Sequence, residues 1–229
     1  MTKHFKLSSI VFTIIMFAGC AGKEKQNDKT NLTETKKVAV DSSNPVKTIL
    51  FFGNSLTAGY GLDPGEAFPA LIQAKIDSAG LEYKTINAGV SGETSSGGNG
   101  RIDWILKQPV DVFVLELGAN DGLRGIPLTE TRKNLQSIID KVKEKYPKAK
   151  LVLAGMQIPP NMGQEYSTQF KNLFPELSKK NNMTLIPFLL QGVARVRELN
   201  QQDGIHPTAA GDKIVAQTVW NVLENVLKP

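Results

Sequence analysis

A serine and a histidine near opposite ends of the sequence have the residue types needed for nucleophilic catalysis. Ser55 follows the apolar run of residues 48–52, and His206 lies three residues after Asp203. An imidazole that accepts the proton of a serine hydroxyl makes that oxygen a nucleophile. A carboxylate beside the imidazole fixes its tautomer and stabilises the imidazolium. Ser55, His206 and Asp203 are therefore a candidate catalytic triad for acyl transfer.

The scarcity of histidine sharpens this assignment. The chain contains two histidines, His4 and His206, and His4 lies in an N-terminal segment that we expect to be removed. His206 is then the only imidazole available as a base. A single histidine is more often structural, and a serine that follows a strand often caps a helix. The nearby Asp203 favours the catalytic interpretation of His206.

Two further clusters combine small and polar residues, which let a substrate approach the backbone. They are residues 87–94 (NAGVSGET) and residues 118–122 (GANDG). Residues 97–100 (GGNG) lack the spacing and the following lysine of a phosphate-binding loop, so we interpret them as a flexible entrance to a helix. Ser91, Ser95 and Ser96 are expected to serve turns and the start of that helix.

Short β-rich runs alternate with segments of helical periodicity from residue 48 onward. The runs predict strands at residues 48–52, 83–87, 110–117, 150–156 and 184–187. Helices are predicted at residues 66–79, 101–107 and 170–180. Apolar positions 135, 138, 139 and 142 mark a further helix that Pro147 ends, and positions 215, 219, 222, 223 and 226 mark a long terminal helix.

This alternation predicts the α/β class. We expect one domain at residues 48–229, a three-layer α/β/α sandwich with a mostly parallel five-stranded sheet of flavodoxin-like type. Such sheets bind ligands at the carboxyl ends of their strands. Ser55 and the two polar clusters directly follow predicted strands, so all three are expected at that edge.

Four motifs together resemble the SGNH (GDSL-like) hydrolase family, most closely its lysophospholipase/thioesterase/arylesterase branch. They are GNSLTAGYG (53–61), NAGVSGETS (87–95), LELGANDGLRG (115–125) and DGIHP (203–207), in the family's order. The resemblance extends from residue 48 to 227. It implies that Ser55 is the nucleophile, that His206 is the base and that Asp203 orients it. It also implies an oxyanion hole formed by the backbone N–H groups of Ser55 and Gly92 and by the Asn120 side chain.

Each implied oxyanion residue has a structural alternative, because Gly92 and Asn120 are also common turn residues. We expect Asp121 to be structural rather than catalytic. One position departs from the family pattern, since Asn54 stands where aspartate is usual. Asparagine keeps the shape and an acceptor oxygen but loses the charge, and we do not infer inactivity from it.

The N-terminus resembles a bacterial lipoprotein signal. Lys3 and Lys6 precede a short apolar run at residues 10–17 that ends at Ala18-Gly19-Cys20. Phe17 departs from the usual small aliphatic residue of such a signal, and an ordinary signal peptide cut near Ala18 is the alternative. We predict a signal peptide at residues 1–19, acylation of Cys20 and a flexible polar tether at residues 20–47. The localisation expected is the cell envelope, anchored by lipid to the outer membrane, with its periplasmic or cell-surface face left open.

The basic charge lies outside the predicted domain. The whole chain has 27 basic and 22 acidic residues, and eight of the former and four of the latter precede residue 48. The remaining 19 basic and 18 acidic residues nearly balance, which argues against a nucleic-acid partner. The single cysteine excludes an internal disulfide. We see no metal ligand set and expect neither metal nor cofactor.

These observations predict a serine ester hydrolase that cleaves acyl esters or thioesters, including lysophospholipids. Apolar residues at positions 156–160 (MQIPP) and in the 120–125 loop favour an acyl chain over a bare acetyl group. A carbohydrate O-deacetylase and a non-catalytic surface-binding lipoprotein are the alternatives. We expect a monomer.

Overall fold

A five-stranded sheet forms the middle layer of the protein in a computed structural model that describes residues 45–228, except for the side chain of Pro160. All neighbouring strands are parallel, in the order β2-β1-β3-β4-β5. Their bounds are β1 (Lys47–Gly53), β2 (Tyr83–Gly89), β3 (Val112–Glu116), β4 (Lys150–Ala154) and β5 (Thr184–Ile186). The predicted α/β class is confirmed, and β1 begins one residue before the predicted domain boundary. The predicted signal peptide, Cys20 and most of the tether lie outside the described residues.

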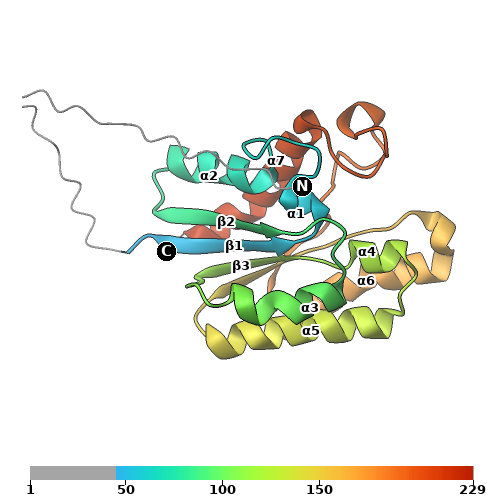
Figure 1. Cartoon of the computed structure of the whole chain (residues 1–229), viewed down its shortest axis with the longest axis horizontal. Helices are drawn as coiled ribbons and strands as arrows, with labels where there is room; N and C mark the ends of the chain where they lie inside the picture. The colour runs from blue at the N-terminus through green and yellow to red at the C-terminus, as the bar shows by residue number, and fades with distance from the viewer. Residues whose placement is uncertain (1–44, 229) are drawn as a thin grey trace, which may run out of the picture. The chain divides into compact units, whose positions relative to one another are not determined.

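Helices cover both faces of the sheet (Figure 1). One face carries α2 (Phe68–Ser78) and α7 (Ala209–Leu227), and the other carries α3 (Ser95–Ile105), α5 (Leu128–Lys145) and α6 (Gln164–Asn181). The shorter elements are α1 (Ser55–Ala58), α4 (Ala119–Leu123), η1 (Pro160–Met162) and η2 (Arg197–Leu199). No helix within residues 45–228 is long and apolar enough to cross a membrane.

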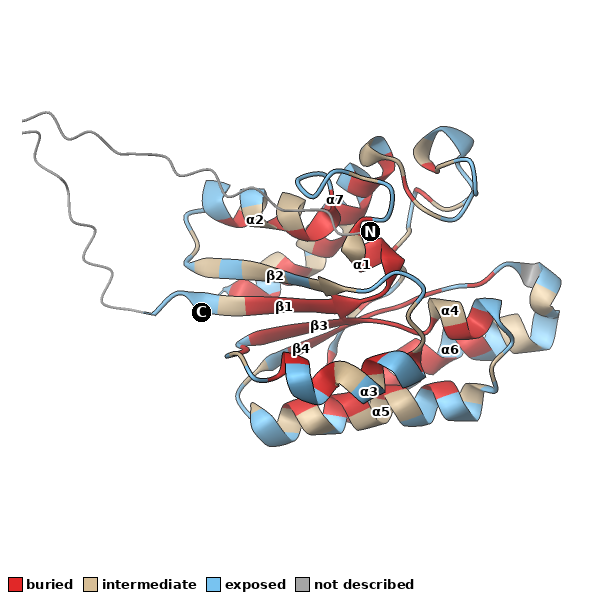
Figure 2. Cartoon of the chain, viewed as in Figure 1, coloured by how far each residue is buried: buried red, intermediate tan, exposed pale blue. Residues whose placement is uncertain are grey.

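The central strands are buried on both faces, as their continuous apolar sequences predict (Figure 2). Successive side chains of a strand point to opposite faces, so neighbours in β1 serve different helix layers. Phe51 meets Phe68 of α2 edge to face at 5.4 Å between ring centroids. Phe52 lies on the α3 side, close to the backbone of Gly98. The residues around Ser55 therefore rest on a rigid, fully covered strand.

The start of α3 differs from the prediction. The helix begins at Ser95 instead of residue 101, so residues 97–100 lie inside it and are not a flexible entrance. Two interactions hold this first turn. The Thr94 side chain caps it at the amide of Gly97, and the Asp121 carboxylate accepts hydrogen bonds from the amide and hydroxyl of Ser95. The prediction of α6 was also short, because the helix begins at Gln164 rather than at residue 170.

The chain reverses its winding direction at β1, and this places the functional edge. From β1 the chain crosses by α2 to β2 on one side and then returns by α3 to β3 on the other side of β1. In open α/β sheets the crevice at such a switch point, outside the carboxyl ends of the strands, is where ligands bind. Ser55 lies directly beyond the end of β1.

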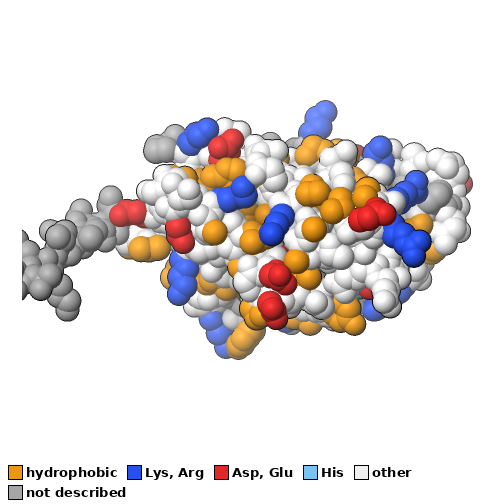
Figure 3. All heavy atoms as spheres, turned by 90° about the horizontal axis from the view of Figure 1, so that it is seen from above, with side chains coloured by type: hydrophobic (Ala, Val, Ile, Leu, Met, Phe, Trp, Pro, Cys, Tyr) orange, Lys and Arg blue, Asp and Glu red, His pale blue; other side chains and the backbone are white. Residues whose placement is uncertain are grey.

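Charged residues of both signs are interspersed on the face shown in Figure 3, the side of the molecule that carries α2 and α7. This distribution matches the near balance of charge in the domain sequence. A field of one sign, as needed to follow a nucleic-acid backbone, is not seen on this face.

Candidate active site

A tight turn between β1 and α1 presents Ser55. Asn54 is the N-cap residue of α1, and its Oδ1 accepts a hydrogen bond from the Leu56 amide at 2.9 Å. A Cβ at Gly53 would collide with the Thr57 hydroxyl, so the strand can enter the helix this closely only because residue 53 is glycine. Ser55 is 8% exposed and its hydroxyl lies on a cleft.

Ser55, His206 and Asp203 form a continuous hydrogen-bonded chain. The Nε2 atom of His206 lies 2.8 Å from Ser55 Oγ, and its Nδ1 atom lies 2.6 Å from Asp203 Oδ2. The other carboxylate oxygen of Asp203 accepts the amides of Ile205 and His206 at 2.9 and 3.0 Å. Asp203 can therefore hold both the backbone and the ring of His206 in place.

The carboxylate of Asp203 is stabilised in its ionised form. Although desolvation raises its pKa, the hydrogen bonds from the His206 ring and from the amides of His206 and Ile205 lower the pKa of Asp203 to about 2. The group is therefore an anion throughout the neutral range, as an acceptor for an imidazole N–H must be.

The loop that carries His206 is fixed to the loop that follows the nucleophile. Gln201 donates from Nε2 to the carbonyl oxygens of Tyr60 and Pro207, at 2.7 and 2.9 Å. Its backbone amide donates to His206 O at 2.7 Å. The Tyr60 ring lies against the imidazole with 4.6 Å between ring centroids. The contacts of Tyr60 with Gln201 and His206 join residues that are 141 and 146 positions apart in the sequence.

The two other predicted oxyanion residues lie on the neighbouring loops. Asn120, at the start of α4, lines the same cleft as Ser55 and donates one amide hydrogen bond to Glu93 O at 2.9 Å. Gly92 has a φ of +79° and its carbonyl accepts a hydrogen bond from Arg124 at 3.0 Å. Gly92 does not itself line the cleft, which passes between the loops after β1 and β3.

An ion pair fixes the turn that contains Gly92. Arg101 of α3 binds Glu93 through Nε and NH2, both at 2.6 Å, and NH2 also donates to Ala88 O at the end of β2. The guanidinium stacks on the Phe52 ring at 4.1 Å. The position of the Gly92 turn is thus set by a side chain that also contacts β1 and β2.

A buried carboxylate lies beneath the nucleophile turn. Glu116, the last residue of β3, is 1% exposed and accepts hydrogen bonds from Asn54 and Thr57. Burial raises the pKa of Glu116 to about 7, and the hydrogen bonds from Thr57 and Asn54 oppose that shift. Glu116 was not predicted as part of the site, although a glutamate inside an otherwise apolar strand is a visible anomaly. The Glu93–Arg101 pair was not predicted either.

Asp121 has the structural role that the sequence predicted. Its carboxylate accepts the amide and hydroxyl of Ser95 and the hydroxyl of Thr131 at 3.3 Å, and it is 1% exposed. It therefore joins the third motif to the start of α3 and to α5, away from the cleft.

The active-site cleft has a volume of about 390 Å³ and mostly apolar walls. As the sequence predicted, residues 156–159 line it. The other apolar side chains of the lining come from α1, α4 and the loops at residues 188–194 and 205. They are Leu56, Ala119, Leu123, Phe188, Leu190, Ala194 and Ile205. Such a cleft suits an acyl chain better than a sugar.

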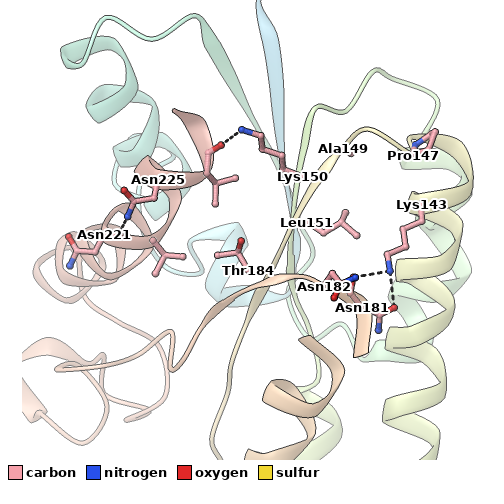
Figure 4. A pocket seen from close by; sticks show the side chains of 12 residues that line it. Lys143, Pro147, Ala149, Lys150, Leu151, Asn181, Asn182, Thr184, Asn221 and Asn225 are labelled. Atoms are coloured by element: carbon pink, nitrogen blue, oxygen red, sulfur yellow. Dashed lines mark hydrogen bonds between the residues drawn. The ribbon is translucent and has the colours of Figure 1, made fainter. Parts of the chain in front are cut away.

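A larger cleft, of about 880 Å³, lies at the opposite, amino ends of β4 and β5 (Figure 4). Its two lysines serve helix ends. Lys143 donates to the backbone and side-chain oxygens of Asn181 at the end of α6, and Lys150 donates to Val226 O at the end of α7. Its lining contains no histidine, serine or carboxylate, whereas Ser55 and His206 line the smaller cleft. Within residues 45–228 no group of three or more His, Cys, Asp or Glu side chains is arranged to hold a metal ion.

Comparison with known proteins identifies the family of this chain. Residues 51–214, more than half of the chain, match the GDSL-like Lipase/Acylhydrolase family. Esterase TesA from Pseudomonas aeruginosa is 36% identical over 182 residues, which cover 79% of this chain and 90% of that protein. Thioesterase 1/protease 1/lysophospholipase L1 from Escherichia coli is 36% identical over 178 residues, covering 77% and 83% respectively. A crystal structure of TesA has a TM-score of 0.75 at 37% identity and covers 79% of this chain and 100% of that chain. The chain therefore belongs to the GDSL-like lipase/acylhydrolase family and is a carboxylic ester hydrolase.

Proposed function

We propose that this protein hydrolyses esters or thioesters of apolar acyl chains through an acyl-enzyme on Ser55. Ser55 Oγ attacks the carbonyl carbon while His206 Nε2 accepts its proton. His206 then donates that proton to the departing alcohol or thiol. Water, activated by the same nitrogen, releases the acid and restores Ser55. The observation that carries the proposal is the hydrogen-bonded chain from Ser55 through His206 to Asp203.

The tetrahedral intermediate needs donors for its oxyanion, and three are proposed. The amide of Ser55 opens α1, where the first amides of a helix have no partner within it. Asn120 uses one of its two amide protons on Glu93 O, which leaves the second for the cleft. The amide of Gly92 is the third. Each such donor contributes roughly 10²–10³ in rate.

The test is turnover of p-nitrophenyl esters together with labelling by a fluorophosphonate probe. His206→Ala should lower kcat by at least about 10³-fold while the circular dichroism spectrum and the unfolding midpoint stay near those of the wild type. The probe should label Ser55 in the wild type and not in Ser55→Ala. Unchanged turnover in His206→Ala would refute the mechanism, and failure of the probe to label Ser55 would favour a non-catalytic binding protein.

The apolar lining of the cleft supports an acyl chain as the group that it binds. We expect kcat/KM on p-nitrophenyl esters to rise from acetyl to medium-length chains, because each methylene that enters the cleft contributes about 0.8 kcal/mol of burial. An optimum at acetyl would point instead to an O-deacetylase. Lysophospholipids, which carry one acyl ester, are the natural class that this cleft and a membrane location would suit together.

We also propose that Cys20 is acylated and that the protein is anchored to the envelope membrane by this lipid. The support is the position of the only cysteine directly after a short apolar run. Cys20→Ser should move the protein from the detergent phase to the aqueous phase in a Triton X-114 partition without changing its esterase activity. Partition of both proteins into the aqueous phase would contradict the lipid anchor.

A further inference from the structure

The active-site cleft has a single side chain with a permanent charge. Its lining contains no aspartate, glutamate or lysine, and Arg195 is the only arginine. Arg195 is exposed, and among the described residues it forms neither a salt bridge nor a side-chain hydrogen bond with a protein group. Arg101 and Arg132, in contrast, are paired with Glu93 and Glu176. A guanidinium in a cleft without carboxylates remains available to a ligand.

The backbone at Arg195 has an unusual conformation. Its φ is +67°, in the left-handed region that side chains with a Cβ avoid. Only one other described residue besides glycine, Asn182, has a positive φ, and it ends α6, where such a conformation is common. A non-glycine residue keeps this conformation only when the surrounding structure holds it, and such positions gather at binding sites.

Buried hydrogen bonds provide that restraint. Asn200 is 8% exposed, and its Nδ2 donates at 2.7 Å to the carbonyl oxygens of both Val193 and Val196. Val193, on one side of Arg195, is fully buried, and the amide of Ala194 donates to Leu190 O at 3.0 Å. One buried amide therefore holds the backbone on both sides of Arg195. Asn200 itself also lines the cleft.

We infer that Arg195 binds an anionic group carried by the ester substrate, so that the enzyme prefers acyl esters bearing a phosphate or a carboxylate over neutral esters. This inference rests on the proposed esterase function of the same cleft. The positively charged guanidinium offers a planar fork of N–H donors that matches both anions. The apolar lining takes the acyl chain, and Arg195 takes the charged group.

The test compares esters of equal acyl length, using the full-length protein and octanoyl chains. The phosphate arm compares octanoyl lysophosphatidylglycerol with mono-octanoylglycerol. The carboxylate arm compares the mono-p-nitrophenyl ester of octanedioic acid with p-nitrophenyl octanoate. Arg195→Gln keeps the length and the Cβ but removes the charge, and Arg195→Glu reverses it. Arg197→Gln is the matched control, because Arg197 lies two residues away in η2, is exposed and does not line the cleft.

We expect Arg195→Gln to lower kcat/KM by about tenfold or more on the anionic ester of at least one arm and by less than about twofold on its neutral partner. Arg195→Glu should lower kcat/KM on the anionic ester further than Arg195→Gln does, and Arg197→Gln should have the kcat/KM values of the wild type. The arm that responds identifies the anion together with the side of the ester that carries it, since the phosphate is on the alcohol side and the carboxylate is at the end of the acyl chain. An equal loss on anionic and neutral esters, or no loss on either, would overturn the inference. Inactivity of the wild type on every ester would instead overturn the proposed function, and with it this inference.

Discussion

At the scale of single residues, Asn54 and Glu116 form a matched pair beneath the nucleophile. Asn54 Nδ2 donates to Glu116 Oε1 at 2.8 Å, while Asn54 Oδ1 accepts the Leu56 amide. The other Glu116 oxygen accepts the Asn54 amide and the Thr57 hydroxyl. Each of these hydrogen-bond partners of the Glu116 carboxylate is thus a donor. An aspartate at position 54 would instead place two carboxyl groups in contact, and the pair would need to share a proton.

This geometry predicts that the amide and the carboxylate can be swapped between positions 54 and 116, whereas changing only one of the two residues destabilises the protein. Asn54→Asp should lower the free energy of unfolding at pH 8 by about 1–3 kcal/mol, since the shared proton is lost as the pH rises through the raised pKa of the pair. Glu116→Gln should cost a similar amount, because its NH₂ group would meet an N–H donor of Asn54, either the side-chain Nδ2 or the backbone amide. In the double variant Asn54→Asp/Glu116→Gln, the new amide donates to the new carboxylate and recovers most of the loss. Urea unfolding at pH 8 measures all three variants.

Measuring the same variants at pH 5.5 provides the control for this swap. At pH 5.5 the shared proton is retained, so Asn54→Asp should be close to the wild type. Glu116→Gln should not recover, because the wild type itself gains stability from protonated Glu116 as the pH falls. Values of kcat measured at both pH values should rank the variants in the same order as their free energies of unfolding, because Asn54 caps the turn that holds Ser55. Losses that simply add in the double variant would show that the two side chains act independently.

The candidate catalytic residues, which the structure brings together, could be predicted from the sequence. The residues that hold them in place could not. His206 was identified because no other imidazole remained, and Asp203 because it lies three residues away. Glu116 and the Glu93–Arg101 pair act through contacts between residues on different loops and strands. Such pairings depend on how the chain folds, so neither composition nor periodicity shows them.

At the scale of elements, the glycines of α3 have different roles despite their shared helix. A Cβ at Gly98 would collide with a methyl group of Leu117 and lie 3.1 Å from Phe52, so this glycine lets the helix pack closely on the sheet. A Cβ at Gly100 would meet nothing within 4 Å. The two positions therefore make a matched test of close packing against helix propensity.

Gly98→Ala should lower the free energy of unfolding by about 1–3 kcal/mol, because the core must move to accept the methyl group. Gly100→Ala should raise it by up to about 1 kcal/mol, because alanine favours the helix over glycine. Thermal unfolding followed by circular dichroism measures both. Equal stabilisation by the two substitutions would contradict the close contact at Gly98.

The sequence predicted the middle of most helices better than their beginnings. Apolar periodicity marks the buried face of a helix, but the first turn of α3 is glycine-rich and has little such periodicity. That turn depends on Asp121, which binds Ser95 from 26 residues away in the sequence. An interaction of this length cannot be inferred from a local pattern, which explains why residues 97–100 were assigned to a flexible entrance.

At the scale of the whole molecule, two buried carboxyl groups join elements that are far apart in the sequence. Glu116 joins β3 to the turn after β1. Asp212, in the first turn of α7, is 2% exposed and accepts the amide of Phe68 at the start of α2 at 2.7 Å. Burial raises the pKa of Asp212 to about 7, an effect that the hydrogen bond from Phe68 opposes. Glu116 has a pKa raised to about the same value.

The shared direction of these shifts predicts how stability depends on pH. A carboxyl whose pKa is higher in the folded state than in the unfolded state binds its proton more tightly when folded. Its contribution is complete below the unfolded value and is lost as the pH rises through the folded value near 7. The free energy of unfolding should therefore fall from pH 5.5 to pH 8.5, by roughly 1–2 kcal/mol for each group. Asp203 stays ionised over this range and should not contribute, since its pKa is lowered to about 2.

Urea denaturation at the two pH values tests this pH dependence, with Asp212→Asn as the comparison. Asparagine keeps an acceptor for the Phe68 amide and cannot titrate. The free energy of unfolding of the variant should fall less between the two pH values than that of the wild type, even if the variant is less stable at both. An identical fall in both proteins would show that Asp212 does not titrate with folding.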